Sequence, residues 1–362
     1  MSIKSIGLST HIWNNNLRCI MMLALYPVLI LGMFWILMLV LGTVSIHVPS
    51  DDVNGLWILV EFSNRIFFDF WPMVVTGVGI WFVISWFSHT QMIRQMAGSH
   101  PVSRQEEPEL YNLLENLCIS QGMPMPGLEI VETHARNAFA SGLHKGNYKV
   151  TVTRGLMNSL SREELEAVLA HELTHIQNND VRLLIVTIIF TGLFGFLAQM
   201  AWRSFVHGIF YRMGNNRNKG GALVLVLLVS LVLGIGYLVS LFMRFALSRK
   251  REYMADAGAI EMTKNPDAMM RALMRISGRD RMPAMSEDIA MMCIENHKSF
   301  LGLFATHPPI EKRIRAISEV TNTPIPDHAS LPPIEKEQSF SQNTEGKRQN
   351  PWLMTDRRGK RG

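Results

Sequence analysis

Charged residues are scarce in this sequence of 362 residues: Asp, Glu, Lys and Arg together make up 18%, against about 25% in an average soluble domain. The mean hydropathy of +0.13 also argues against a purely soluble protein. Cysteine is nearly absent, and the three that occur, Cys19, Cys118 and Cys293, lie far apart. This excludes a disulfide scaffold and a zinc cluster of thiolates, and it fits a reducing compartment or buried thiols.

The sequence also lacks a glycine-rich phosphate loop, an internal repeat and a nucleic-acid-binding module. The net charge of +5 and the pI of 9.2 therefore do not indicate a nucleic-acid partner. We assign the basic excess to the flanks of apolar segments and to the C-terminal tail. For the basic end of the tail, contact with anionic lipid and a merely solvated tail stay open as alternatives.

Four long runs contain no Asp, Glu, Lys or Arg, and they cover residues 19–46, 70–88, 183–202 and 221–243. A helix needs roughly 20 apolar residues to cross the hydrocarbon core, so each run is long enough. The first run is too long for a signal peptide and has no small-residue cleavage site, which predicts a retained anchor. For the last two runs, a pair of buried core helices and a membrane hairpin that does not fully cross stay open as alternatives.

The charges beside these runs predict an orientation. Lys4 and Arg18 precede the first run without an acidic residue, which favours the cytoplasm. The loop before the second run has four acidic residues and one basic residue, which favours the outside. The segment of residues 89–181 is then cytoplasmic. The link between the third and fourth runs disagrees, because it carries four basic residues and no acid although a simple count places it outside.

The segment after the second run has the pattern of a mixed α and β domain. Leucines at helical spacing predict a helix over residues 108–121, and β-branched residues and Tyr predict short strands over 128–131 and 148–152. A second soluble part, from residue 248 to about 320, is predicted to be mostly helical. After residue 321 the chain is rich in Pro, Ser, Gln and Lys, so we expect a disordered tail.

The predicted fold class is α+β and mostly helical, for an integral membrane protein with about four transmembrane helices. The predicted segments are a cytoplasmic N-terminus (1–18), two transmembrane helices with a short external loop (19–88), a first soluble part (89–181), two further transmembrane helices or a membrane hairpin (182–246), a second soluble part (247–320) and a polar tail (321–362).

A metal site is predicted on a helix that begins at a capping box, Ser161-Arg-Glu-Glu164. His171 and His175 are four residues apart, so both imidazoles lie on one helix face and can bind one Zn²⁺. Glu172 is directed beside the metal, where its carboxylate can accept a proton from an attacking water molecule. The alternative is a pair of surface histidines on a solvated helix.

A catalytic zinc site needs a third protein ligand, and Glu252 is the candidate. His175 lies just before the third apolar run, and Glu252 lies just after the fourth. If these two runs form a two-pass hairpin, the helix with His175 and the helix with Glu252 meet at the same membrane face. A solvated helix within a charged segment is the alternative interpretation of Glu252. Asp256, one turn later, is placed to hold a zinc-binding imidazole through its second ring nitrogen.

These motifs resemble those of the HtpX-type membrane zinc metalloproteases, which are relatives of the CAAX prenyl protease and of OMA-type peptidases. The resemblance covers about residues 18–320. It rests on His171-Glu-Leu-Thr-His175, Glu252-Tyr-Met-Ala-Asp256, Asn137-Ala-Phe-Ala140, Lys149-Val-Thr-Val-Thr-Arg-Gly155 and Thr306-His-Pro-Pro309. It implies a zincin-like (gluzincin) catalytic domain with one Zn²⁺ per chain, an HExxH helix and a small sheet with an edge strand.

By this resemblance the two histidines and Glu252 are the zinc ligands, and Glu172 is the general base. An edge strand would pair with the substrate backbone, and it would be formed by Asn137, Ala138, Phe139 and Ala140. An ordinary turn and strand is the alternative there. His307 would donate to the oxyanion of the tetrahedral intermediate, although His-Pro-Pro is also an ordinary way to begin a helix.

The function that these residues and the resemblance together imply is a zinc metalloendopeptidase of the bacterial cytoplasmic membrane, with its catalytic domain in the cytoplasm. Its expected substrates are unfolded or damaged membrane proteins, which it would degrade in quality control. The lipid bilayer is a further expected partner, and no nucleic-acid partner is expected. One alternative is a CAAX-prenyl-protease-like processing peptidase. Another is a membrane scaffold or transporter, which is disfavoured because the four runs lack Asp, Glu, Lys and Arg and no expected ligand is missing.

Overall fold

The computed structural model describes residues 3–45, 54–212, 229–238, 250–277 and 308–327. The elements in chain order are α1 (Ile3–Ser45), α2 (Gly55–Ala97), β1 (Ser99–Pro101), α3 (Pro108–Ser120), β2 (Gly127–Val131), β3 (Ala138–Ser141), β4 (Lys149–Thr153), α4 (Arg154–Ser159), α5 (Arg162–Gln177), α6 (Asp180–Arg212), α8 (Lys250–Thr263), α9 (Pro266–Ile276) and α11 (Ile310–Thr321). A further helix covers Val229–Leu238.

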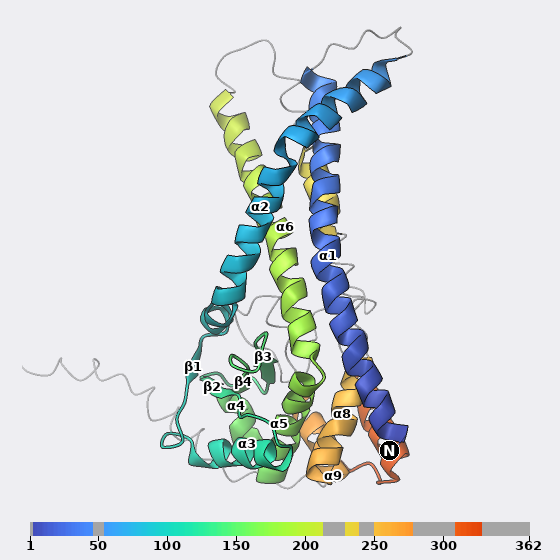
Figure 1. Cartoon of the computed structure of the whole chain (residues 1–362). Helices are drawn as coiled ribbons and strands as arrows, with labels where there is room; N and C mark the ends of the chain where they lie inside the picture. The colour runs from blue at the N-terminus through green and yellow to red at the C-terminus, as the bar shows by residue number, and fades with distance from the viewer. Residues whose placement is uncertain (1–2, 46–53, 213–228, 239–249, 278–307, 328–362) are drawn as a thin grey trace, which may run out of the picture.

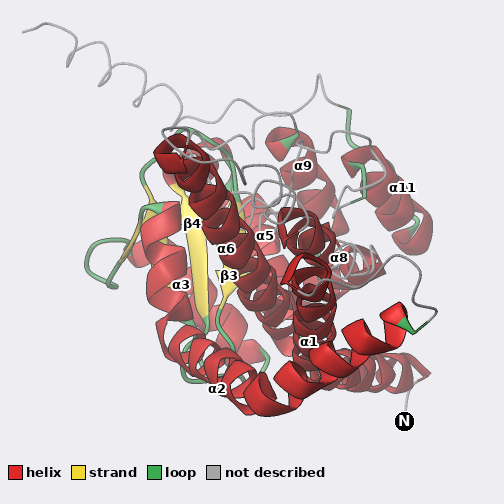
Figure 2. Cartoon of the chain, turned by 90° about the horizontal axis from the view of Figure 1, so that it is seen from above, coloured by secondary structure: helices red, strands yellow, loops and turns green. Residues whose placement is uncertain are grey.

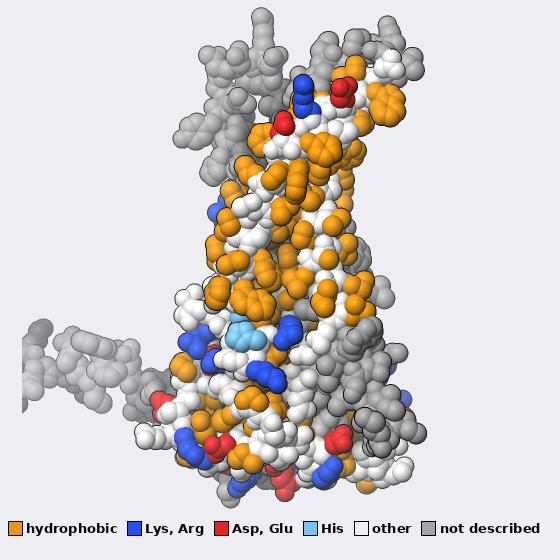
Figure 3. All heavy atoms as spheres, in the orientation of Figure 1, with side chains coloured by type: hydrophobic (Ala, Val, Ile, Leu, Met, Phe, Trp, Pro, Cys, Tyr) orange, Lys and Arg blue, Asp and Glu red, His pale blue; other side chains and the backbone are white. Residues whose placement is uncertain are grey.

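Three long helices, α1, α2 and α6, rise together from a compact part that contains the sheet and the shorter helices (Figure 1). Hydrophobic side chains cover most of the column that these helices form, whereas Lys, Arg, Asp and Glu lie mainly around the compact part and at the far end of the column (Figure 3). The described residues are mostly helical with one small mixed sheet, as the sequence predicted.

Three helices of the described part are long and apolar enough to cross a membrane, over Leu23–Thr43, Gly55–Ala97 and Asp180–Met200. They contain most or all of the first three uncharged runs. The fourth run lies largely outside the described residues, and its described piece is the helix Val229–Leu238. Within its most apolar stretch, α6 buries 61% of its residues and α2 buries 0%, so α6 is the inner helix of the column.

Aromatic side chains hold α6 against its two neighbours. The ring of Phe190 in α6 stacks on Tyr26 of α1, with 4.2 Å between ring centroids, and lies 5.9 Å from Phe82 of α2. The indole nitrogen of Trp81 in α2 donates a hydrogen bond to the carbonyl of Ile189, at 3.2 Å. These contacts make α1, α2 and α6 one packed unit, seen end-on in Figure 2.

The described strands form one sheet in the order β1-β2-β4-β3, in which β3 is an edge strand. β2 and β4 are parallel, while β1 and β3 pair antiparallel with their neighbours. β2 and β4 correspond to the two predicted strands, whereas β1 was not predicted. Asn137, which was predicted to begin the edge strand, precedes β3, and its backbone N–H donates to Thr153 Oγ1 at the end of β4.

The helix α5 begins at the predicted capping box, with reciprocal bonds between Ser161 and Glu164. The Glu164 carboxylate is fully buried, and its oxygens lie 2.9 Å from Nε of Arg275 and 3.3 Å from Nε of Arg271. Both arginines belong to α9. Glu164 therefore caps α5 and also fixes α9 beside the first turn of α5.

The helices α5 and α8 pack closely because a glycine lies at their contact. A Cβ atom on Gly258 of α8 would meet Cγ2 of Thr174 at 2.4 Å and its Oγ1 at 2.7 Å. Thr174 is buried in α5 and cannot easily move away. Any side chain at Gly258 would therefore push the two helices apart.

Replacing Gly258 with Ala should lower the stability by about 1–3 kcal/mol, the usual cost of overpacking, despite the gain in helix propensity. Gly192→Ala in α6 is the matched control, because a Cβ there meets no atom within 4 Å. Thermal unfolding in detergent, followed by circular dichroism, measures both. Equal unfolding temperatures for the two variants would contradict the tight α5–α8 contact.

Candidate metal centre

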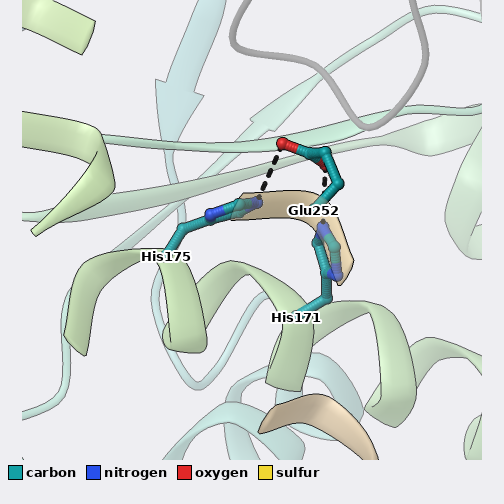
Figure 4. A group of neighbouring side chains, drawn as sticks. All are labelled: His171, His175 and Glu252. Carbon is teal, nitrogen blue, oxygen red and sulfur yellow. Dashed lines mark ion pairs between the residues drawn. The ribbon is translucent and has the colours of Figure 1, made fainter. Parts of the chain in front are cut away.

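Two helices bring three potential metal ligands together. α5 supplies His171 and His175, one turn apart, and α8 supplies Glu252 (Figure 4). One nitrogen from each imidazole and one carboxylate oxygen all lie within 4.8 Å of one another. Glu252 directs one oxygen at each ring, because Oε2 lies 3.7 Å from Nε2 of His171 and Oε1 lies 3.8 Å from Nε2 of His175.

This geometry fits a small divalent cation. Both nitrogen–oxygen distances are too long for hydrogen bonds. Two atoms bound at about 2.0–2.1 Å to a tetrahedral ion lie roughly 3.3 Å apart, so a slight contraction would suit the three ligands. Two imidazoles and one carboxylate are a zinc-type donor set with one coordination position left.

The other nitrogen of each imidazole faces a buried carboxylate. Nδ1 of His171 lies 3.1 Å from Oδ1 of Asp256, and Nδ1 of His175 lies 2.9 Å from Oδ2 of Asp180. Carboxylates in these positions fix the ring orientation and leave Nε2 of each ring directed at the metal position. Asp256, the residue proposed from the sequence to hold an imidazole, thus lies beside Nδ1 of His171.

Asp180 was missed by the sequence analysis. It is the first residue of α6 and lies five positions after His175. Asn179, with a φ of 59°, adopts the left-handed conformation that turns the chain back between α5 and α6. The signal in the sequence was the Asn-Asn-Asp turn, but only the backbone conformation shows that it returns a carboxylate to the site.

Arg313 was also missed, although it is fully buried. It lies in α11, and its guanidinium donates to both oxygens of Asp256, at 2.9 Å from Nε and 2.6 Å from Nη2. The same group lies near two of the potential ligands, since Nη2 is 3.5 Å from Nε2 of His171 and Nη1 is 3.9 Å from Oε2 of Glu252. Arg313 therefore attaches α11 to the centre.

The electric field of the site stabilises positive charge. Burial alone would lower the pKa of His175, but the carboxylates of Glu252 and Asp180 outweigh it and raise that pKa to about 10. Burial would likewise raise the pKa of Asp256, but the Arg313 guanidinium lowers it below its ordinary value. A cation is electrostatically favoured between these carboxylates.

Of the remaining predicted site residues, some lie within the described residues and one lies outside them. Glu172 is buried in α5 beside His171, and its charge contributes to the raised pKa of Arg313. The residues Ala138 to Ala140 lie in the edge strand β3, which packs against α5. His307 lies outside the described residues, as does the predicted tail from residue 328 onward.

The chain matches the family described as peptidase family M48 over residues 104–321. It belongs to this family. The matched segment contains the three potential ligands and Arg313, which are the residues that form the centre described above. As an M48 peptidase with apolar helices of membrane-spanning length, the protein is a membrane metalloprotease, and hence a hydrolase.

Relatives named "Protease HtpX homolog" match most of the chain, which confirms the predicted resemblance. The protein of Bacteroides fragilis is 44% identical over 326 residues, covering 88% of this chain and 100% of the relative. That of Ligilactobacillus salivarius is 37% identical, covering 67% and 82%. The crystal structure of S. mikatae Ste24p is 19% identical, with a TM-score of 0.39, and the match covers 84% of this chain and 66% of Ste24p.

Replacing Arg313 with Met should destabilise the protein by about 3–5 kcal/mol, because the buried Asp256 carboxylate loses its guanidinium partner. The double variant Arg313→Met/Asp256→Asn should regain part of that loss, since no uncompensated charge is left. Arg315→Met, an exposed position in the same helix, serves as the control. Unfolding in detergent with chelator present measures the series. An Arg313→Met variant as stable as Arg315→Met would disprove the buried ion pair.

Proposed function

We propose that the protein is a zinc-dependent endopeptidase that degrades misfolded or damaged membrane proteins from the cytoplasmic side of a bacterial cytoplasmic membrane. The observation that carries the zinc assignment is the convergence of His171, His175 and Glu252 from two helices, with a buried carboxylate behind each imidazole. This arrangement lies within the segment that matches the M48 peptidases.

The chain's own residues supply the steps around the metal. When bound, zinc would act as a Lewis acid that polarises the scissile carbonyl and lowers the pKa of water. Glu172 accepts the proton of the attacking water and later passes it to the leaving amine. Asp256 and Asp180 hold the imidazoles in place. Zinc is favoured over harder cations because two of the three donors are imidazole nitrogens.

Substrate binding is assigned to the sheet edge. Among the described strands β3 pairs with β4 alone, so its other edge has backbone groups that can pair with an extended peptide. Its residues Ala138, Phe139 and Ala140, with Asn137 before it, would align the substrate beside α5. We keep His307 as the proposed donor to the developing oxyanion.

The cytoplasmic orientation rests on the charges that flank the membrane helices. Lys4 and Arg18 lie before the first apolar run, and the acidic loop follows it. In the structure the beginning of α1 lies beside the compact part of the molecule (Figure 1). The metal centre would then share the cytoplasmic side with the N-terminus, where misfolded cytoplasmic loops of membrane proteins are within its reach.

Glu172→Gln should reduce turnover by at least about 10²-fold, because the amide cannot accept a proton. Its zinc content should stay unchanged. Cleavage of an unfolded casein-like substrate by detergent-purified protein measures turnover, and elemental analysis measures zinc. Glu166→Gln in the same helix is the matched control. Near-normal cleavage by Glu172→Gln would rule out its role as base, and loss of zinc together with activity would make it a ligand instead.

Glu252→Ala should leave an inactive protein that lacks zinc, since it removes a direct ligand. Asp256→Asn should retain zinc when the metal is plentiful but lose roughly 10–100-fold in metal affinity or activity. Glu261→Ala, on the same helix, should behave as wild type. Zinc titration of the three purified variants distinguishes the roles. They would be reversed if Asp256→Asn lost the metal and Glu252→Ala kept it, and retention by both would place the third ligand elsewhere.

A further inference from the structure

Two arginines flank Glu252, one on each carboxylate oxygen. Nη1 of Arg313 lies 3.9 Å from Oε2, the oxygen that faces His171. Nη2 of Arg251 lies 3.9 Å from Oε1, the oxygen that faces His175. Each arginine thus lies beside a different half of the metal centre, and the two halves differ in exposure and in hydrogen bonding.

The two guanidinium groups differ in how their donors are used. Arg313 donates to both oxygens of Asp256. Arg251 is only 4% exposed, and its Nη2 is too far from Glu252 to donate a hydrogen bond. Within the part of the chain that the structure describes, Nε of Arg251 has no hydrogen-bond partner. Buried guanidinium groups nearly always donate to acceptors, because an unsatisfied buried charge is costly. Arg251 therefore has a donor for which the described residues supply no acceptor.

The exposed side of the centre is the side on which Arg251 lies. The side chain of His175 is 12% exposed, whereas those of His171 and Glu252 are each 1% exposed. A ligand that approaches the metal position from solvent meets the His175 half first. Oε1 of Glu252 and Nη2 of Arg251 belong to that half, while the Arg313 half is closed by Asp256 and α11.

We propose that Arg251 binds a carboxylate of the peptide substrate, close to the scissile bond. A guanidinium presents a planar fork of N–H donors that matches a carboxylate, and such charge-assisted pairs are among the strongest hydrogen bonds in proteins. Because Arg251 lies 3.9 Å from an oxygen of a metal ligand, the bound carboxylate belongs to a residue within about two positions of the cleaved bond. This proposal rests on the proposed peptidase function.

Two sources can supply this carboxylate: the free C-terminus of the substrate, or an Asp or Glu side chain beside the scissile bond. The C-terminal source would make the enzyme release short C-terminal fragments. The side-chain source would make it an endopeptidase with a preference for acidic positions. Four otherwise identical peptides separate the sources, with the C-terminus as acid or amide and with Asp or Asn beside the cleaved bond.

The wild-type enzyme loaded with zinc should cleave the favoured carboxylate peptide with a kcat/KM about 10–100-fold above that of its neutral counterpart, the range expected for a hydrogen bond to a charged group. Arg251→Gln should abolish this preference through a raised KM, with kcat largely unchanged. Arg251→Lys should keep part of it. Arg315→Gln, which removes an exposed arginine from α11, should keep all of it.

Binding and metal content provide readouts that do not depend on turnover. The four peptides should bind to zinc-loaded Glu172→Gln with the same carboxylate preference, and adding Arg251→Gln should remove that preference at constant zinc content. A wild type with no carboxylate preference overturns the proposal even where Arg251→Gln does not fold. Equal loss of kcat on all four peptides, or loss of zinc, also overturns it, because Arg251 would then act through Glu252. If the peptides bind with the preference but wild type cleaves none of them, the peptidase function fails and the carboxylate site stands.

Discussion

The close contact between α5 and α8 is the constraint on which the metal centre depends. Two histidines on one helix supply only two potential ligands, and the third potential ligand, Glu252, comes from a helix about 80 residues later in the chain. Gly258 and Thr174 allow the two helices to approach until Glu252 directs one oxygen at each imidazole. The capping box at Ser161–Glu164, with its two arginine partners, fixes the position of α5 and α9 around this contact.

The centre concentrates buried charge, and its neighbours are arranged to compensate for it. The Asp256 carboxylate pairs with both His171 and Arg313, while the Asp180 carboxylate pairs with His175. Removing one partner from such a network costs more than removing a matched pair, because a charge is left without compensation in a medium of low polarity. This links α5, α6, α8 and α11 in one cooperative unit. Arg251 differs, since its Nε finds no hydrogen-bond partner among the described residues.

The membrane helices are attached directly to the catalytic part. α6 begins at Asp180, so the carboxylate that orients His175 also begins a helix of membrane-spanning length. The turn between β3 and β4 is held from two helices: Nδ2 of Asn147 lies 3.1 Å from Nε2 of His89 in α2, and Nε of Arg182 in α6 donates to the carbonyl of Leu143 at 2.9 Å. The edge strand is therefore fixed to the helical column.

Local spacing determined much of what the sequence could predict. The i, i+4 histidines, the capping box, the apolar runs and the strands at β2 and β4 each depend on neighbours a few residues apart, and periodicity reveals such contacts. The placement of Glu252 required an additional argument from topology. Only the tertiary structure showed the strand order and the contacts of Asp180 with His175 and of Arg313 with Asp256. It alone also showed that Arg313 and Arg251 differ in their hydrogen bonds. These depend on contacts between helices up to 142 positions apart, and the side chains that meet there are selected by packing, which no spacing along the chain encodes.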